Sequence, residues 1–160
     1  MHGDNRTIFP SASSTNWDLV LYKTLEALTR TQTRLKWFIA EKDWKVTFKI
    51  FDYGFLATHG DMIRSYYNLP YYGMTRQSER WSNAYRDKIK LEYFLFSHFH
   101  SLNTGQRWND LEIFVNGSFV TDDEYAERGL GICSKPEQLL FGVHSKYGVT
   151  WRYRLSLGGG

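Results

Sequence analysis

The sequence predicts a sheet protein of the α/β or α+β class, and three observations support this prediction. Segments typical of strands alternate along the chain with two segments of helical periodicity. The composition suits a globular core, because 42% of the 160 residues are hydrophobic and 23% are charged. No repeat, low-complexity run or linker divides the chain, so we expect a single domain over residues 1–160.

Two helices are expected from the spacing of apolar residues. The first runs over 16–40, where apolar side chains recur at helical spacing, with a break near the polar stretch 29–33. Residues 62–77 contain a proline and a glycine and are expected to be irregular. A shorter helix follows at 78–90.

The strands are expected from alternating or continuous apolar runs. Residues 93–100 form a nearly continuous apolar run, typical of a strand buried on both faces. Residues 101–110 are polar and are expected to form a loop. The other expected strands alternate apolar and polar residues and lie at 44–51, 55–61, 111–120 and, as a terminal hairpin, within 137–157.

Charge and cysteine content narrow the classes of protein. Cys133 is the single cysteine, which excludes an internal disulfide framework and a cysteine-based zinc cluster. The net charge of +3 is spread along the chain and only weakly favours an anionic partner. Residues 1–10 lack the apolar core of a signal peptide, and no stretch reaches the roughly 20 apolar residues of a membrane span. We therefore expect a cytoplasmic protein without a membrane partner.

The histidines carry the strongest functional pattern. His98 and His100 form an H-x-H at the end of an apolar run, and alternate residues of a strand point to the same face. His59 ends another apolar strand in T-H-G-D, where Gly60 lets the chain turn. Ligands of open α/β sheets bind beyond the carboxyl ends of the strands, so the pattern predicts imidazoles that converge on a metal. The alternative is that they are hydrogen-bonded structural residues, as we expect for His144.

Four short motifs, in order, resemble those of one enzyme family. F-S-H-F-H-S around His98 is similar to a G-H-x-H motif, with Ser97 in place of its glycine. A-T-H-G-D around His59 is similar to the histidine motif that precedes G-H-x-H in the family. N-G-S at Asn116 is similar to the segment that follows G-H-x-H. The opening H-G-D-N-R, from His2, is similar to the tail of a G-N-H motif. Together they resemble the calcineurin-like metallophosphoesterases, in particular phage-type, DNA-exonuclease-like members.

The resemblance implies a fold, a reaction and a set of site residues. The fold would be an α/β sandwich of mixed β-sheets flanked by helices. The reaction would be metal-dependent hydrolysis of phosphodiesters, DNA among them, with two divalent ions drawn from Mn, Fe, Zn or Ni. His59 and His98 would ligate one ion and His100 the other. His2 would be catalytic, approaching the substrate phosphate and protonating the leaving group.

The resemblance covers only the C-terminal half of the family pattern. The D-x-H motif, the bridging Asp and the Asn of G-N-H would lie before Met1, so the N-terminal part of the fold is expected to be missing. A truncated gene start, a split enzyme completed by a second chain and a degenerate remnant all agree with this pattern. We expect little or no hydrolase activity from the isolated chain. If the gene is phage-encoded, the compartment would be the host cytoplasm.

A basic and aromatic segment is the candidate for substrate binding. Arginines alternate there with tyrosines, and single-stranded nucleic acid is held by such stacking and cationic groups. The candidates are Arg64, Tyr66, Tyr67 and Arg76. Alternatively, the tyrosines pack the segment against the sheet. Two rival functions remain open: a non-catalytic module of this fold that binds nucleic acid or a partner, and a single-metal structural histidine site.

Overall fold

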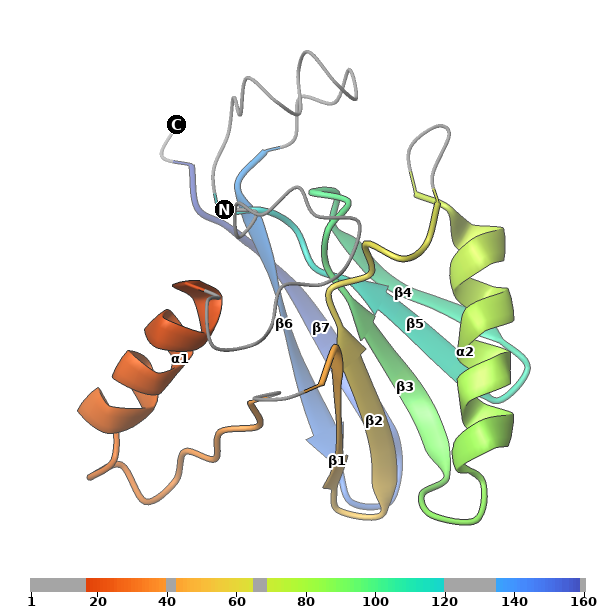
Figure 1. Cartoon of the computed structure of the whole chain (residues 1–160), viewed down its shortest axis with the longest axis horizontal. Helices are drawn as coiled ribbons and strands as arrows, with labels where there is room; N and C mark the ends of the chain where they lie inside the picture. Colours follow the sequence, from red (N-terminus) through yellow and green to blue (C-terminus); the bar gives the residue numbers. More distant parts are fainter. Residues whose placement is uncertain (1–16, 40–42, 65–68, 120–134, 159–160) are drawn as a thin grey trace. The chain divides into compact units, whose positions relative to one another are not determined.

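The computed structural model of the chain describes residues 17–39, 43–64, 69–119 and 135–158 (Figure 1). Residue contacts divide the chain into two compact units, Met1–Val46 and Thr47–Gly160. A single domain over 1–160 stays a prediction.

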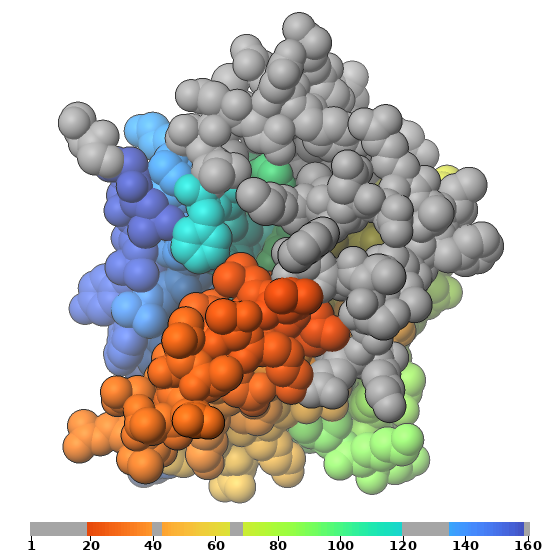
Figure 2. All heavy atoms as spheres, turned by 60° about the vertical axis from the view of Figure 1, so that its left-hand side comes forward, coloured from red at the N-terminus to blue at the C-terminus, as the bar shows by residue number. Residues whose placement is uncertain are grey.

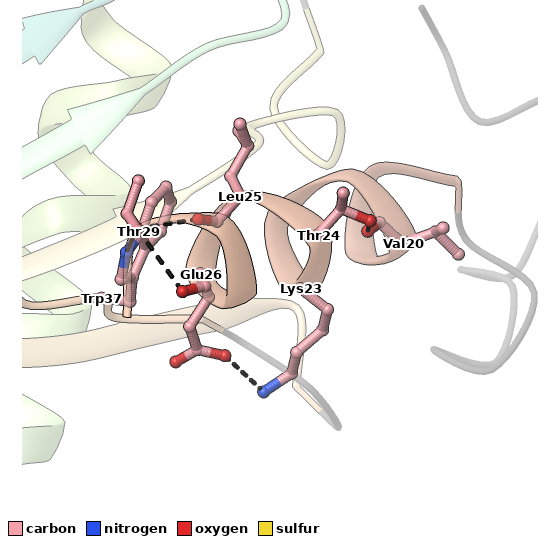
Figure 3. Close-up of polar contacts among 7 residues, drawn as sticks. All are labelled: Val20, Lys23, Thr24, Leu25, Glu26, Thr29 and Trp37. Atoms are coloured by element: carbon pink, nitrogen blue, oxygen red, sulfur yellow. Dashed lines mark hydrogen bonds and ion pairs between the residues drawn. The ribbon is translucent and has the colours of Figure 1, made fainter. Parts of the chain in front are cut away.

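The first unit contains one described helix, α1 (Trp17–Leu28). After it, the N–H and the hydroxyl of Thr29 both donate to the carbonyl oxygen of Leu25, at 3.0 and 2.7 Å (Figure 3). The indole of Trp37 donates to the same hydroxyl at 3.0 Å, so the chain folds back after the helix. The break expected near Thr29 is confirmed, but the helix expected up to residue 40 is wrong, because threonine hydroxyls that bond the backbone disfavour its continuation.

The rest of the described chain contains a helix, α2, and seven strands. The elements are β1 (Lys45–Ile50), β2 (Tyr53–Thr58), α2 (Tyr71–Tyr85), β3 (Leu91–Phe96), β4 (Asn103–Trp108), β5 (Leu111–Val115), β6 (Glu137–His144) and β7 (Gly148–Ser156). A five-stranded sheet has the order β1-β2-β3-β5-β4, and β6 pairs with β7 in a second, antiparallel sheet. Strands β2, β3 and β5 are parallel and β4 is antiparallel to β5, so the large sheet is mixed.

Helix α2 covers one face of the five-stranded sheet and the β6–β7 hairpin covers the other (Figure 1). An apolar cluster lies on each face. On one face, Met74 and Trp81 of α2 pack against Phe94 and Phe96 of β3. On the other face, the β6–β7 hairpin packs against a cluster that includes Phe55, Tyr93, Phe114 and Val149. The predicted α/β class is therefore confirmed, with helix, mixed sheet and hairpin in three layers.

The β6–β7 hairpin buries only one of its faces. It lies at the surface of the molecule, where it is blue in Figure 2. Leu140, Trp151 and Tyr153 are exposed, whereas Val149 is buried in the cluster shared with the large sheet. The terminal hairpin expected within 137–157 is confirmed.

Three sequence expectations for the second unit need correction. Helix α2 begins at Tyr71, inside the segment expected to be irregular. Glycine fits at position 73 of this helix because any Cβ there would come within 2.9 Å of Cγ2 of Ile63. The expected loop 101–110 contains strand β4, whose side chains are mostly exposed because it is an edge strand. The strands expected over 55–61, 93–100 and 111–120 end earlier, at Thr58, Phe96 and Val115.

Candidate metal centre

Two of the predicted histidines lie at the same edge of the sheet. His59 directly follows β2, and His98 follows the neighbouring parallel strand β3. Thr58 is in register with Phe96, and the N–H of Ser97 donates to the carbonyl oxygen of His59 at 3.0 Å, which extends the pairing beyond both strands. The carboxyl ends of parallel strands share one edge, so this arrangement follows from the topology.

The two imidazole rings are in direct contact. Nδ1 of His98 lies 3.1 Å from Nε2 of His59, and the ring centroids are 4.9 Å apart at an interplanar angle of 74°. A hydrogen bond at this distance needs one ring nitrogen to donate and the other to accept. The structure therefore brings together the two histidines that the resemblance assigns to one metal; that they ligate a metal stays a prediction.

The spacing of the pair fits a divalent ion. With metal–nitrogen bonds of about 2.0–2.1 Å, two ligand nitrogens are about 3.3 Å apart at a tetrahedral angle and about 2.9 Å apart at a right angle. The observed 3.1 Å lies between these values. An ion bound here would take Nδ1 of His98 and Nε2 of His59 as ligands. Within the described parts of the chain, no third His, Cys, Asp or Glu completes a cluster with the pair.

The H-x-H segment is not part of a strand, because β3 ends at Phe96. The prediction that strand alternation points His98 and His100 to the same face is therefore wrong. His98 and His100 have φ values of 68° and 54°, in the left-handed region that L side chains rarely adopt. The N–H of Phe99 donates to the carbonyl oxygen of Ser97 at 2.7 Å, so residues 97–99 form a γ-turn with a positive central φ. His98 is thus placed by a strained turn. His100 is half-buried and belongs to no described cluster of three or more metal-ligating side chains.

The strain at His98 predicts an unusual order of variant stabilities. We expect His98→Gly to be more stable to urea than His98→Ala by about 1–2 kcal/mol, because glycine adopts a positive φ without a steric penalty. His144, in strand β6, is the control, and there glycine should be less stable than alanine by about 0.5–1 kcal/mol. If the alanine variant were more stable to urea than the glycine variant at His98 as well as at His144, the backbone strain at His98 would be contradicted.

Gly60 supports the turn beside the pair, as the sequence predicts. Its φ is 100°, and its carbonyl oxygen accepts a hydrogen bond from the N–H of Ile63 at 3.0 Å. The chain therefore turns away immediately after His59.

Asn116 has a structural role that its motif did not reveal. It follows β5, and its N–H donates to the carbonyl oxygen of Phe96 at 2.7 Å. Its side-chain oxygen accepts from the N–H of Leu139 at 2.8 Å, and its amide nitrogen donates to Oε1 of Gln138 at 2.6 Å. Asn116 therefore ties the hairpin to the large sheet next to the histidine turn. The signal in the sequence was only the N-G-S motif.

The other candidate residues are not brought to the pair by any described contact. Arg64 and Arg76 are exposed, the first after the turn at Ile63 and the second on α2. His2, Tyr66 and Tyr67 lie outside the described residues. Their assigned roles stay predictions. None of the described helices is long and apolar enough to cross a membrane.

Comparison with known proteins identifies the fold. No protein-family model and no curated protein matches the sequence. Among solved structures, the chain is similar to wild-type Vps29 from Entamoeba histolytica in complex with zinc, with a TM-score of 0.53 and 12% identity over 85% of this chain and 77% of that one. It is also similar to a single mutant of the same protein, with a TM-score of 0.50 and 10% identity over 79% and 66% of the two chains. The chain thus has a fold similar to that of Vps29.

Proposed function

We propose that this chain binds a divalent transition metal between His59 and His98 and acts in metal-dependent phosphodiester hydrolysis, with DNA as the candidate substrate. The observation that carries the proposal is the 3.1 Å approach of Nε2 of His59 to Nδ1 of His98 at the carboxyl edge of the sheet. Neutral imidazoles suit Zn, Mn, Fe and Ni. The similar Vps29 structure, described as a zinc complex, supports a metal of this class.

The chain's own side chains would hold the ion and attract the phosphate. A divalent ion supplies a Lewis acid for a phosphoryl oxygen and charge for the transition state. His59 and His98 would fix its position at the sheet edge. The exposed guanidinium groups of Arg64 and Arg76 are suited to phosphate oxygens, which arginine binds in a bidentate manner.

The described residues supply fewer ligands than a catalytic site uses. Catalytic zinc sites have three protein ligands, whereas two described side chains meet here. We propose that further ligands come from outside the described residues or from a second chain. The role of His100 as a ligand of a second ion is part of the same proposal.

Metal-dependent binding of a phosphodiester tests the proposal. The probe is a fluorescent single-stranded oligonucleotide, titrated with the purified chain in Mn²⁺ and in EDTA and followed by anisotropy. We expect Mn²⁺ to tighten binding on the order of tenfold, or about 1.4 kcal/mol. The gain should be absent in a His59→Ala/His98→Ala double variant and retained in His144→Ala, because the exposed His144 lies in the β6–β7 hairpin.

The other outcomes distinguish the rival functions. Binding that is salt-sensitive but equal in Mn²⁺ and EDTA would contradict the proposal and indicate a non-catalytic nucleic-acid-binding module. Unfolding by EDTA without any effect on the oligonucleotide would indicate a structural metal. Hydrolysis of bis-p-nitrophenyl phosphate clearly above that of the double variant would support catalysis and contradict the expectation that the isolated chain is incomplete.

A further inference from the structure

The residue between the two left-handed histidines is deeply buried. Phe99 is 5% exposed and belongs to the same core cluster as Phe94 and Phe96. His98 and His100, on either side of it, both have positive φ. The segment therefore holds two strained polar residues around one apolar anchor.

The backbone of Phe99 closes the turn that presents His98. Its N–H donates to the carbonyl oxygen of Ser97 at 2.7 Å, and the N–H of Ser97 donates to the carbonyl oxygen of His59 at 3.0 Å. Through Ser97, these two hydrogen bonds link the backbone of Phe99 to that of His59, and the first of them closes the turn that has His98 at its centre. A γ-turn with a positive central φ is rare and strained, so it persists only where surrounding contacts hold it.

The ring of Phe99 contacts both sides of the pair. It meets the ring of His98 edge to face, with centroids 5.3 Å apart and an interplanar angle of 78°. A Cβ placed on Gly60 would lie 3.4 Å from Cε2 of Phe99, so the ring also packs against the residue that follows His59. One buried side chain thus contacts His98 itself and the turn that orients His59.

We propose that Phe99 is a positioning residue, whose buried ring holds the 97–99 turn and so sets Nδ1 of His98 opposite Nε2 of His59. This inference rests on the proposed metal function for its consequence, but the positioning itself is a property of the metal-free chain. Leucine at this position fills less of the core and lacks the ring edge and face that meet His98. Phe99→Leu should therefore keep the fold while loosening the pair.

The experiment compares Phe99→Leu with Phe94→Leu. Phe94 is fully buried in β3 in the same cluster, and no ring contact joins it to a histidine among the described residues, so its variant reports loss of core packing alone. The first readout needs no metal: the nuclear Overhauser effect between the ring protons of His59 and His98. We expect it in the wild type and in Phe94→Leu, and expect it to be lost or strongly weakened in Phe99→Leu.

The second readout is Co²⁺ affinity, measured from the visible absorption of the bound ion. We expect Phe99→Leu to weaken Co²⁺ binding about 10- to 100-fold, the range seen when groups that orient metal ligands are removed. Phe99→Trp, which restores an aromatic ring, should recover part of the loss. A wild-type Overhauser effect and wild-type Co²⁺ affinity in Phe99→Leu would overturn the positioning role. If the wild type shows the ring contact but binds no Co²⁺, the proposed function fails while the first readout still decides the role of Phe99.

Discussion

Replacement of Glu112 by alanine should lower the free energy of unfolding by about 1.5–3 kcal/mol, because it removes a charge-assisted hydrogen bond from a partly buried ion pair. The side chain of Glu112 is 7% exposed and pairs with Arg152 of β7, between the two sheets. The guanidinium carbon of Arg152 lies 5.5 Å from the ring centroid of Phe114, and Nε of Arg152 is buried with no hydrogen-bond partner among the described residues. Removing the carboxylate leaves Arg152, whose side chain is 30% exposed, without its counter-charge.

Urea unfolding measures this loss, and two variants serve as controls. In Glu112→Leu/Arg152→Met both charges are replaced by apolar groups, and we expect stability near that of the wild type, since such replacements are often neutral or stabilising. Lys90→Ala removes an exposed partner of Glu92 and should cost less than about 1 kcal/mol. If Glu112→Ala cost no more than Lys90→Ala, the pair would not be the buried contact between sheets that the structure shows.

His98→Ala should reduce zinc affinity by on the order of 100-fold or more, because in the proposed site it removes a ligand and not merely a group that orients one. Isothermal titration calorimetry of the purified chain at pH 7.5 measures the change. His59→Ala should have a similar effect, since each imidazole of the contacting pair would contribute one nitrogen to the proposed site. His144→Ala is the matched control: His144 is exposed in the hairpin, and its Nδ1 accepts a hydrogen bond from the N–H of Lys146 at 3.0 Å.

The pH dependence of zinc affinity gives a further check on the proposed pair. Imidazole must be neutral to bind metal, and its ordinary pKa is about 6.5. Zinc affinity of the wild type should therefore fall as the pH is lowered and the imidazoles become protonated. Zinc binding by His98→Ala with wild-type affinity would contradict the assignment of the pair.

The pairing of His59 with His98 could be anticipated because it depends on topology. Both residues end apolar runs, and strands of such runs align in a parallel sheet with their carboxyl ends together. The local geometry could not be anticipated. The sequence pattern predicts that H-x-H is part of a strand. In the structure, the chain forms a turn with positive φ at His98, and Phe99 is buried in the core. Long-range packing decides this, and it leaves no periodic signal.

The errors in secondary structure have the same origin. Strand β4 is polar because it lies at the edge of the sheet, and it is a strand because its backbone pairs with β5. Helix α2 extends back to Tyr71 through Gly73, which allows close packing on Ile63. Edge strands and glycine-containing helix starts resemble loops in a sequence, since their structure is set by partners elsewhere in the chain. The buried strand β3 and the terminal hairpin have strong local patterns, and both were predicted.

The most direct test of the metal centre is to follow the imidazole nitrogens of the ¹⁵N-labelled chain by NMR during a zinc titration. We expect the signals of Nε2 of His59 and Nδ1 of His98 to shift together and to reach their end point at one equivalent of zinc. The ring nitrogens of His144 should not move before that point. Zinc that shifts His144 first, or that leaves either nitrogen of the pair unchanged at saturation, would contradict the claim that His59 and His98 bind one ion.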